Sequence, residues 1–464
     1  MSTTTIKKII ISNFKSIKDL EIELAPLTIF VGPNGSGKSS ILEALALMSQ
    51  CSKRNASIRS GKAIEGGEDA LVEYGEFRSI FHRGLDEIEL SLGITVNIPV
   101  EEIKPSIIKE LDVFSEITKK PPQPPYIKES NALFAYLKFL QSLNLNKEVF
   151  NIEYVYSTSK SHYLHSYIIE GNKITYGYNS EYDKPINLPS EFELRASLGD
   201  AVLSPYSIFN LNSFFSQKLV EIIKGRLSKV YYISAERGNI PWYYPVGAAK
   251  HGWVGKKGEY TLEILAELMK PANENKRLPY EILCEKFGIK NMWVGWDRSN
   301  YLTSDYADPY LGSAHKFPSL GYGSRQLLPI IAQLSYSNPS DVILIEEPEI
   351  SLHPSYQRLL PVLFGRAVNE GKQILVTTHS SYFVLSLDLV LEGYRLEGQT
   401  TRGLRSYEVK LLPSDIAVYH VIRDEKEGYT KAEKLELDER GLKEGIPSFI
   451  NVEREILEKF ISKE

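Results

Sequence analysis

The sequence predicts an α/β fold with a mixed, mainly parallel sheet, and three observations lead to this prediction. A glycine-rich loop at residues 32–39 joins an apolar strand to a helix. Apolar strands alternate with helices over residues 316–391, which is typical of a parallel sheet buried on both faces. Residues 6–24 instead alternate with period two, which predicts an antiparallel β-subdomain ahead of that sheet.

The composition is that of an ordinary globular protein large enough for two or three domains. The chain has 464 residues, of which 42% are hydrophobic and 24% charged. We expect no transmembrane helix, because no apolar run reaches about 18 residues, and no signal peptide. Two cysteines, Cys51 and Cys284, form no disulfide or metal framework. Such cysteine usage suits a reducing cytoplasm, so a cytoplasmic protein without a membrane partner is expected. The net charge of −5 means that no global basic field indicates nucleic-acid binding.

The first residues predict a β-hairpin that leads into the glycine-rich loop. Period-two positions on both sides of a turn at residues 13–16 predict two antiparallel strands, and Pro26 separates them from the strand of the loop. Beyond the helix that follows the loop, residues 51–73 are polar and glycine-rich, which predicts a mobile loop. Further strands are expected at residues 72–82 and 87–96.

Residues 32–39 fit the P-loop pattern G-x-x-x-x-G-K-[ST] at every fixed position. Glycines let backbone N–H groups converge on phosphate oxygens, and the start of the following helix adds a positive dipole end. Lys38 is expected to reach the β- and γ-phosphates of ATP, and the Ser39 hydroxyl to bind Mg²⁺. The expected nucleotide cradle consists of Asn34, Gly35, Ser36, Gly37, Lys38, Ser39 and Ser40. The alternative, a glycine turn that merely precedes a helix, does not explain Lys and Ser in register.

The middle of the chain, residues 99–227, carries no motif of known chemistry. Successive prolines predict an extended linker at 119–125, a helix is expected at 132–143, and tyrosine-rich strands are expected at 151–156 and 163–178. No heptad pattern is sustained, so a long coiled coil is not expected. Two interpretations stay open: a compact α/β insertion that packs on the core, or an arm that binds a partner.

From residue 228 the sequence becomes core-like again. A strand at 230–233 is followed by short helices at 261–269 and 279–287, with a loop over 270–277 between them. The remaining expected elements are a helix from 327, a strand at 342–345, a helix at 356–368, a strand at 374–377, tail strands at 407–412, 416–423 and 431–437, and a charged helix at 452–461.

Two acidic residues end the apolar strand at 342–345. Like charges at the end of a buried strand repel each other, so a structural role explains them poorly, and a surface acidic turn is the alternative. A P-loop protein needs a carboxylate for Mg²⁺ and a group that orients the attacking water, which we assign to Glu346 and to Glu347 as general base. His379 follows the next apolar strand and is expected to sense or stabilise the γ-phosphate; a structural histidine is the alternative.

The order of these motifs resembles the ABC-type ATPases of the SMC, RecF and OLD kind, and more closely the stand-alone AAA family ATPases of the AAA_15 and AAA_21 type. The first resemblance rests on the motifs at 13–16, 32–39, 346–349 and 378–380. The second rests on a Gly-aromatic-Gly-x-x-Gln signature at 321–326, on Ser-Leu-His-Pro at 351–354, and on residues 235–237 and 254–261. The resemblance covers residues 6–90 and 228–391 but not 100–225.

The resemblance implies an ABC-type ATPase head that dimerises around two molecules of ATP. Its expected parts are an N-terminal lobe at 1–98, the insertion at 99–227, a C-terminal lobe with a helical signature subdomain at 228–391, and a β-rich tail at 392–464. Each ATP is expected to lie between the P-loop of one subunit and the signature segment, residues 321–326, of the other. The further residues implied are Gly323, Ser324 and Gln326 in trans, Lys15 and Ser16 beside the nucleotide, and residues 351–354 at the dimer contact. Gly323 stands where the signature of the wider family has serine, and residues 81–84 stand where it has a Q-loop glutamine.

The resemblance also implies a function, with two alternatives. The first hypothesis is an ATP-hydrolysing switch, a homodimer or higher homo-oligomer, that controls double-stranded DNA or a separate nuclease or toxin effector in antiphage defence or DNA repair. The tail lacks the Glu and Asp-x-Asp pattern of a nuclease, so any nuclease is expected on another chain. The alternatives are a nucleotide-binding subunit of a transporter, and a nucleotide-gated assembly protein with little turnover. Residues 13–16 and the insertion argue against the transporter, and the Glu346–Glu347 pair argues against low turnover.

Overall fold

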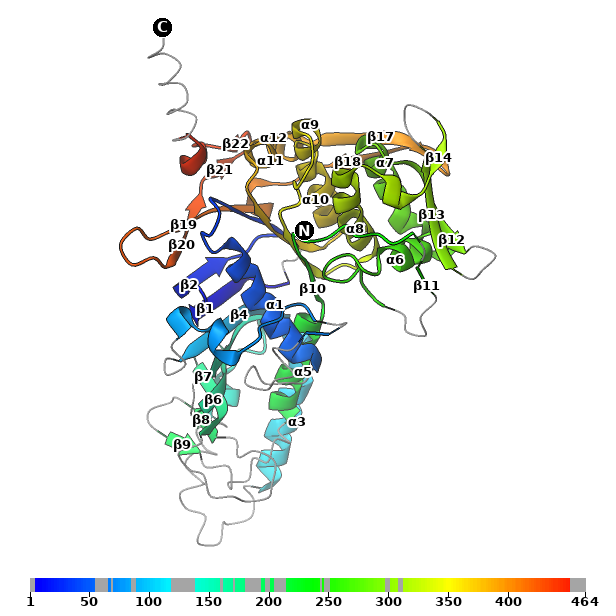
Figure 1. The fold of residues 1–464 in the computed structure, drawn as a ribbon. Coiled ribbons are helices and arrows are strands. Elements are labelled where there is room, and N and C mark those ends of the chain that lie inside the picture. The colour runs from blue at the N-terminus through cyan, green and yellow to red at the C-terminus, as the bar shows by residue number, and fades with distance from the viewer. Residues whose placement is uncertain are drawn as a thin grey trace.

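The structure is a computed structural model in which two sheets enclose one central helix. It describes residues 5–54, 66–67, 70–84, 89–117, 138–158, 162–169, 172–179, 193–196, 201–203, 214–242, 244–245, 251–296, 301–307 and 312–450. Helix α1 (Lys38–Arg54) lies between the two sheets, and most of the other helices belong to the upper part of the view in Figure 1. The antiparallel sheet forms the lower part of the same view.

The central sheet is parallel except at one edge. Its order is β10 (Val230–Ile233), β15 (Val342–Glu346), β16 (Gln373–Thr378), β3 (Leu27–Val31), β19 (Ile416–Arg423) and β20 (Thr430–Leu435). Neighbouring strands run parallel from β10 to β19, and β20 runs antiparallel to β19. The prediction of a mainly parallel sheet is confirmed, and the tail supplies a strand directly beside the strand of the P-loop.

Alternate residues of the central sheet fill two separate cores. In β3, Phe30 belongs to the core shared with α1, whereas Ile29 belongs to the core on the opposite face. Leu344 and Ile345 of β15 are divided between the two cores in the same way. A sheet that is buried on both faces needs apolar residues at successive positions, which is why these strands read as continuous apolar runs.

The antiparallel sheet continues from the N-terminal hairpin into the insertion. Its order is β2 (Ile17–Glu23), β1 (Lys8–Phe14), β4 (Leu90–Pro99), β5 (Val149–Thr158), β6 (His162–Ile169), β7 (Asn172–Asn179), β8 (Glu193–Ala196) and β9 (Ala201–Leu203). The predicted hairpin is confirmed, with Ile9 opposite Ile22. Helices α3 (Val100–Ile117) and α5 (Phe214–Ser228) pack together, and α5 also packs on α1. Strand β5 and helix α5 of the insertion thus pack on the core, whereas β6 to β9 extend the sheet away from it (Figure 1).

Helices and a small sheet cover the other face of the central sheet. The helices are α6 (Thr261–Leu268), α7 (Glu274–Lys286), α8 (Tyr322–Tyr336) and α10 (Leu360–Asn369). The small sheet contains β11 (Tyr244–Pro245), β12 (Lys290–Trp296), β13 (Tyr301–Ala307) and β14 (Ala314–His315). Further short elements are η5 (Phe317–Ser319), α9 (Pro354–Gln357), α11 (Ser381–Leu385), α12 (Asp388–Glu392), η6 (Pro413–Asp415), β21 (Leu437–Asp438) and β22 (Gly441–Leu442).

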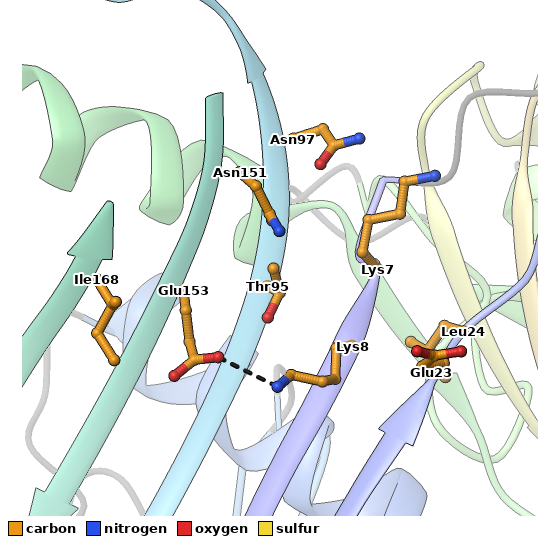
Figure 2. Close-up of a pocket in the computed structure, with 9 residues that line it drawn as sticks. All are labelled: Lys7, Lys8, Glu23, Leu24, Thr95, Asn97, Asn151, Glu153 and Ile168. Atoms are coloured by element: carbon orange, nitrogen blue, oxygen red, sulfur yellow. Dashed lines mark ion pairs between the residues drawn. The ribbon is translucent and has the colours of Figure 1, made fainter. Parts of the chain in front are cut away.

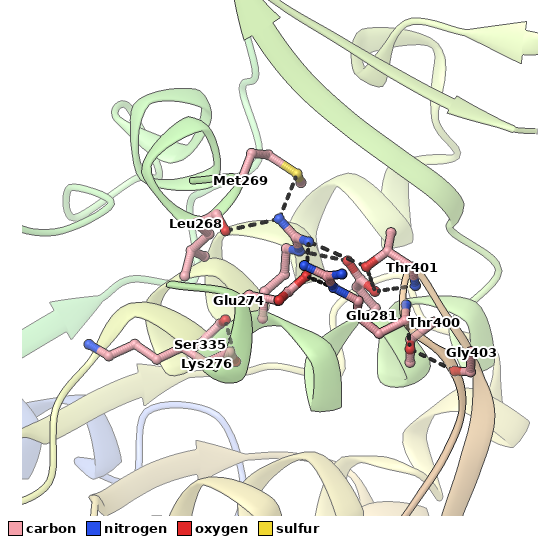
Figure 3. Close-up of polar contacts among 11 residues, drawn as sticks. Leu268, Met269, Glu274, Lys276, Glu281, Ser335, Thr400, Thr401 and Gly403 are labelled. Atoms are coloured by element: carbon pink, nitrogen blue, oxygen red, sulfur yellow. Dashed lines mark hydrogen bonds and ion pairs between the residues drawn. The ribbon is translucent and has the colours of Figure 1, made fainter. Parts of the chain in front are cut away.

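Polar contacts fasten the hairpin of β17 (Tyr394–Thr400) and β18 (Gly403–Val409) to α7, as Figure 3 shows. The buried Arg277 donates to Glu281 Oε1 (2.6 Å) and to the carbonyl oxygen of Leu268 (3.2 Å). Thr401, which follows β17, donates both its N–H and its hydroxyl to the Glu281 carboxylate, each at 3.3 Å. None of these residues is among those predicted to act on a nucleotide.

Several expected elements differ from the structure. The strand expected at residues 72–82 is wrong: this segment is a loop that continues into η1 (Phe77–Ile80) and η2 (His82–Gly84), and its buried apolar residues follow no period of two. The loop expected over 270–277 is wrong as well. Residues Pro271–Asn273 form η4, and α7 begins at Glu274 and runs through Pro279, because burial of its apolar face outweighs the missing N–H.

The helix expected at 356–368 is two helices, since α9 ends at Gln357 and α10 begins at Leu360 with a proline in its first turn. The strand expected at 163–178 is the hairpin of β6 and β7. Of the helix expected at 132–143, residues 138–143 are described: 138–142 are helical, and 143 is a bend outside the helix. The linker at 119–125, the helix at 452–461 and most of the loop at 51–73 lie outside the described residues.

A groove of about 650 Å³ lies on the face of the antiparallel sheet that points away from α1 (Figure 2). It is lined by Lys7, Lys8, Glu23, Leu24, Thr95, Asn97, Asn151, Glu153 and Ile168. Lys8 of β1 is paired with Glu153 of β5 at 3.2 Å. The lining mixes amines, amides and carboxylates, and it includes none of the residues predicted to bind a nucleotide.

In the described ranges, no helix has both the length and the apolarity that crossing a membrane requires.

Candidate functional site

Three neighbouring strands bring the predicted catalytic residues to one edge of the central sheet. Strands β3 and β16 end side by side, and so do β16 and β15. The P-loop follows β3, Glu347 follows β15 and His379 follows β16. The carboxyl ends of parallel strands are where α/β proteins place ligand-binding groups. Lys38 accordingly lies within electrostatic reach of Glu346, Glu347 and Glu349.

The P-loop has the backbone shape that a phosphate cradle requires. Gly35 and Gly37 have φ values of 72° and 103°, in the left-handed region that favours glycine. A Cβ on Gly37 would lie 2.1 Å from Thr430 Oγ1, so a larger residue does not fit there. The buried Lys38 donates its ammonium protons to the carbonyl oxygens of the two residues that open the loop, at 3.0 and 2.8 Å. Burial lowers the pKa of Lys38 to about 8.

The tail hairpin of β19 and β20 packs on the P-loop. Thr430, the first residue of β20, donates its hydroxyl to the Ser36 carbonyl oxygen (2.9 Å) and lies 2.8 Å from the Ser16 hydroxyl. Its N–H donates to the Ser16 carbonyl oxygen (2.8 Å). Arg423 at the end of β19 donates to the Gly35 carbonyl oxygen (2.7 Å). Sequence reasoning missed Thr430 and Arg423, because 394 positions separate Thr430 from Ser36 and no motif marks either residue.

These contacts predict that Thr430 preserves the shape of the P-loop. Thr430→Val keeps the size of the side chain but removes the hydroxyl, so the Ser36 carbonyl loses its partner. We expect ATP affinity to fall about tenfold, since one unsatisfied buried group costs about 1–3 kcal/mol. Titration with a fluorescent ATP analogue measures this change, and Thr430→Ser, which keeps the hydroxyl, is the matched control. Equal affinities of the valine and serine variants would contradict the prediction.

Lys15 and Ser16 lie in the turn between β1 and β2. Ser16 faces the P-loop side, with its hydroxyl 3.5 Å from that of Ser40. Lys15 forms an ion pair with Glu43 of α1, and its ammonium lies 4.8 Å from the centre of the Tyr74 ring. His82, from the segment that stands in place of a Q-loop glutamine, lies with Nδ1 2.9 Å from the Lys15 carbonyl oxygen. Lys15 is therefore held against α1 by Glu43 and Tyr74, two neighbours that sequence reasoning missed.

Glu346 and Glu347 end β15 in different surroundings. Glu346 is buried, and its carboxylate accepts the N–H of Ala235 (3.2 Å). Glu347 leaves the strand direction with a φ of 43°, and its Oε1 lies 3.4 Å from His379 Nε2. Hydrogen bonding with His379 lowers the pKa of Glu347, so this carboxylate is ionised at neutral pH. Glu346 is thus an enclosed carboxylate, and Glu347 is a half-buried carboxylate beside a histidine.

Glu349 belongs to the same edge, although sequence reasoning assigned it no role. Its carboxylate accepts the backbone N–H of His379 at 2.6 Å, which fixes the start of the segment after β16. Burial raises the pKa of Glu349. The signal for this residue was present in the sequence, because it is the last residue of the acidic motif at 346–349.

The predicted signature residues lie at the start of α8. Gly323 and Ser324 are half-buried, and Gln326 is buried. A Cβ on Gly323 would lie 2.4 Å from the Ser351 carbonyl oxygen, which explains the glycine. Arg237 donates to the Gln326 carbonyl oxygen (2.8 Å). These contacts join the signature segment to the acidic motif at the end of β15. In the strand order of the central sheet, β15 and the tail hairpin of β19 and β20 lie on opposite sides of β3.

The buried polar atoms at the carboxyl ends of the central strands indicate whether this edge of the sheet suits a phosphate ligand. Ser36 Oγ in the P-loop and Thr377 Oγ1 near the end of β16 have no hydrogen-bond partner within the described chain. Such atoms are costly unless a ligand or water satisfies them. Ser39, half-buried at the start of α1, and Glu346 supply the oxygen ligands that Mg²⁺ prefers. Ser40 is also half-buried, while Asn34 and Gly35 are exposed. The residues present therefore fit a phosphate-bearing ligand with Mg²⁺.

Two family models match the chain. The model described as "AAA ATPase domain" matches residues 5–240, which include the P-loop and the insertion. The model described as "AAA domain, putative AbiEii toxin, Type IV TA system" matches residues 312–386, which include the signature segment, the acidic motif and His379.

Curated relatives match over a short stretch. The chain is 34% identical over 91 residues to the DNA replication and repair protein RecF of Erwinia tasmaniensis, which is 19% of this chain and 23% of that protein. It is 37% identical over 90 residues to RecF of Vibrio vulnificus, again 19% of this chain and 23% of that protein. The match thus spans less than a quarter of the length of these relatives.

The chain also aligns, at low identity and low TM-score, with solved structures of SMC heads. A crystal structure of the SMC head bound to the C-terminal winged-helix domain of ScpA aligns with a TM-score of 0.43 and 11% identity, over 93% of this chain and 98% of that one. The SMC head domain from Thermotoga maritima aligns with a TM-score of 0.34 and 12% identity, over 88% of this chain and the whole of that one.

Proposed function

The chain belongs to the AAA ATPase domain family, and on that premise we propose that it binds ATP with Mg²⁺ and hydrolyses it. The observation that carries the proposal is the convergence of Lys38, Glu347 and His379 at one sheet edge. These residues follow three different strands that are neighbours only in the folded sheet.

Each residue has a task in the proposed reaction. Lys38 and the P-loop N–H groups bind the phosphates, and Ser39 and Glu346 hold Mg²⁺, which neutralises phosphate charge when bound. Glu347 accepts a proton from the attacking water, since its carboxylate is ionised and half-buried at the same edge. His379 orients that carboxylate from the neighbouring strand.

We further propose that two chains enclose two ATP molecules, with Gly323, Ser324 and Gln326 acting on the nucleotide of the other subunit. Tyr322, beside these residues, is 55% exposed although it is large and aromatic, which suits a surface that a partner covers. His353, within the expected dimer contact at 351–354, is also exposed. ATP then acts as the switch that joins and releases the two heads.

The target of the switch is proposed as double-stranded DNA or a separate effector protein. The relatives over 90 residues are named for DNA replication and repair, and the second family description names a toxin–antitoxin system. A role in DNA repair or in antiphage defence accords with these names, in a homodimer or a higher homo-oligomer.

Two measurements test this function. The first is steady-state ATP hydrolysis with and without double-stranded DNA, and the second is the mass of the protein by light scattering with and without ATP and Mg²⁺. We expect Mg²⁺-dependent turnover and a doubling of mass when ATP and Mg²⁺ are added. Stimulation by DNA would support a DNA-coupled clamp, whereas turnover indifferent to DNA would favour a protein effector. An absence of both turnover and assembly in ATP and Mg²⁺ would refute the proposal.

A further inference from the structure

Arg237 forms a buried cluster of hydrogen bonds beside the candidate site. It follows β10, its side chain is 4% exposed, and its guanidinium donates to four backbone carbonyl oxygens. The acceptors are Ser234 (2.9 Å), Gln326 (2.8 Å), Glu346 (2.6 Å) and Glu347 (2.9 Å). One side chain thus joins the start of the signature helix α8 to both acidic residues at the end of β15.

A second contact holds the same two elements together. Gly238, with a φ of 83°, lies so close to α8 that a Cβ would be 2.9 Å from the Arg325 carbonyl oxygen and 3.0 Å from the Gln326 nitrogen. Its N–H donates to the Lys257 carbonyl oxygen (3.2 Å), which fixes the segment on its other side. Residues 237–238 therefore pack tightly between α8 and the end of β15.

We propose that Arg237 is a positioning residue that couples the signature segment to the general base of the same subunit. The inference rests on the proposed function, in which the signature segment contacts the ATP of the other subunit. Because Arg237 binds Gln326 and Glu347 at once, a shift of α8 on that ATP moves the backbone that carries Glu347. ATP bound at the P-loop of one subunit thereby sets the position of Glu347, the general base, in the other subunit.

The chemistry of arginine explains why this residue type stands here. A guanidinium is a planar fork with five N–H donors, so it can hold several carbonyl groups in fixed directions, whereas an ammonium group cannot hold the same set. Burial lowers the pKa of Arg237 to about 10, and the nearby carboxylates of Glu349, Glu346 and Glu347 partly offset this by favouring its positive charge. Arg237→Lys keeps the charge and removes the fork, so it separates positioning from electrostatics.

The test compares ATP binding, turnover and cooperativity in Arg237→Lys and in the wild type. We expect the affinity for a fluorescent ATP analogue to change less than about twofold, because the P-loop is untouched. The turnover number is expected to fall about 100-fold, as for a base displaced by about 1 Å. The Hill coefficient of hydrolysis is expected to fall from near 2 to near 1, since two sites no longer communicate. Loss of stability alone would not produce this combination.

Arg277→Lys is the matched control, because Arg277 is also a buried arginine with carbonyl and carboxylate partners but takes no part in the site. It should lower the melting temperature while leaving turnover and cooperativity intact. If Arg237→Lys does not fold, Gly238→Ala disturbs the same contact with α8 in a different way, because its Cβ would lie against the Arg325 carbonyl oxygen. The same loss of cooperativity is expected.

The outcomes separate the inference from the function on which it rests. Wild-type turnover and cooperativity in both Arg237→Lys and Gly238→Ala would overturn the coupling role and leave the ATPase proposal standing. A wild-type protein that neither hydrolyses ATP nor doubles its mass would overturn both proposals. A fall in ATP affinity equal to the fall in turnover would assign Arg237 to folding of the nucleotide site instead of coupling.

Discussion

Glu347→Gln is expected to hydrolyse ATP about a thousandfold more slowly than the wild type while binding it equally well. The carboxylate of Glu347 is ionised at neutral pH, and hydrogen bonding with His379 lowers its pKa further, so it can accept a proton from water. An amide of the same size cannot accept that proton. The backbone of Glu347, which donates its N–H to the Thr377 carbonyl oxygen at 2.9 Å, is unaffected by the change.

The slow variant should accumulate in the ATP-bound form, so light scattering in ATP and Mg²⁺ should show a stable dimer. Single-turnover hydrolysis measures the chemical step, and a nucleotide titration confirms that binding is retained. Glu346→Gln is the control from the same strand end: it should weaken Mg²⁺-dependent binding, because Glu346 is the enclosed oxygen donor. Normal turnover by Glu347→Gln would remove this residue from the role of general base.

The parts of the fold that the sequence predicts well are those with local signals. The P-loop, the acidic end of β15 and the position of His379 each follow a continuous apolar strand, and strand order in a parallel sheet brings such ends together. The hairpin of β1 and β2 has a clear period of two, and the structure confirms it. No long-range information is needed for any of these predictions.

The errors come from segments in which tertiary packing decides the structure. Residues 72–82 contain apolar residues that suit a strand, but these residues fill gaps against α1 and the N-terminal hairpin without regular spacing. The tail contributes β19, which pairs with the strand of the P-loop, and places Thr430 against the P-loop across 394 positions of the sequence. Arg237 lies in a stretch that the resemblance marks, yet its four carbonyl partners come from three separate segments of the chain.

Lys38→Ala is expected to bind ATP far more weakly than the wild type. The Lys38 ammonium is buried at the start of α1 and supplies the positive charge of the phosphate cradle. Removing one partner of a buried charged contact costs about 2–5 kcal/mol, which corresponds to a loss of affinity of roughly 30-fold to 5,000-fold. Equilibrium dialysis with labelled ATP measures the loss, and thermal unfolding without nucleotide shows whether the variant remains folded. Retained affinity would contradict the assignment of Lys38.

The same amine predicts how ATP binding depends on pH. Burial lowers the pKa of Lys38 to about 8 in the chain without nucleotide, and a phosphate beside the amine raises that pKa because it favours the charged form. Binding therefore takes up a proton above pH 8, so the affinity of the wild type should fall as pH rises through about 8 to 9, by up to tenfold per unit. Lys38→Ala has no amine to protonate, and its weak residual binding should lack this decline. A wild-type affinity that stays constant from pH 7 to 9.5 would show that Lys38 remains charged throughout, and that the carboxylates at the sheet edge outweigh its burial.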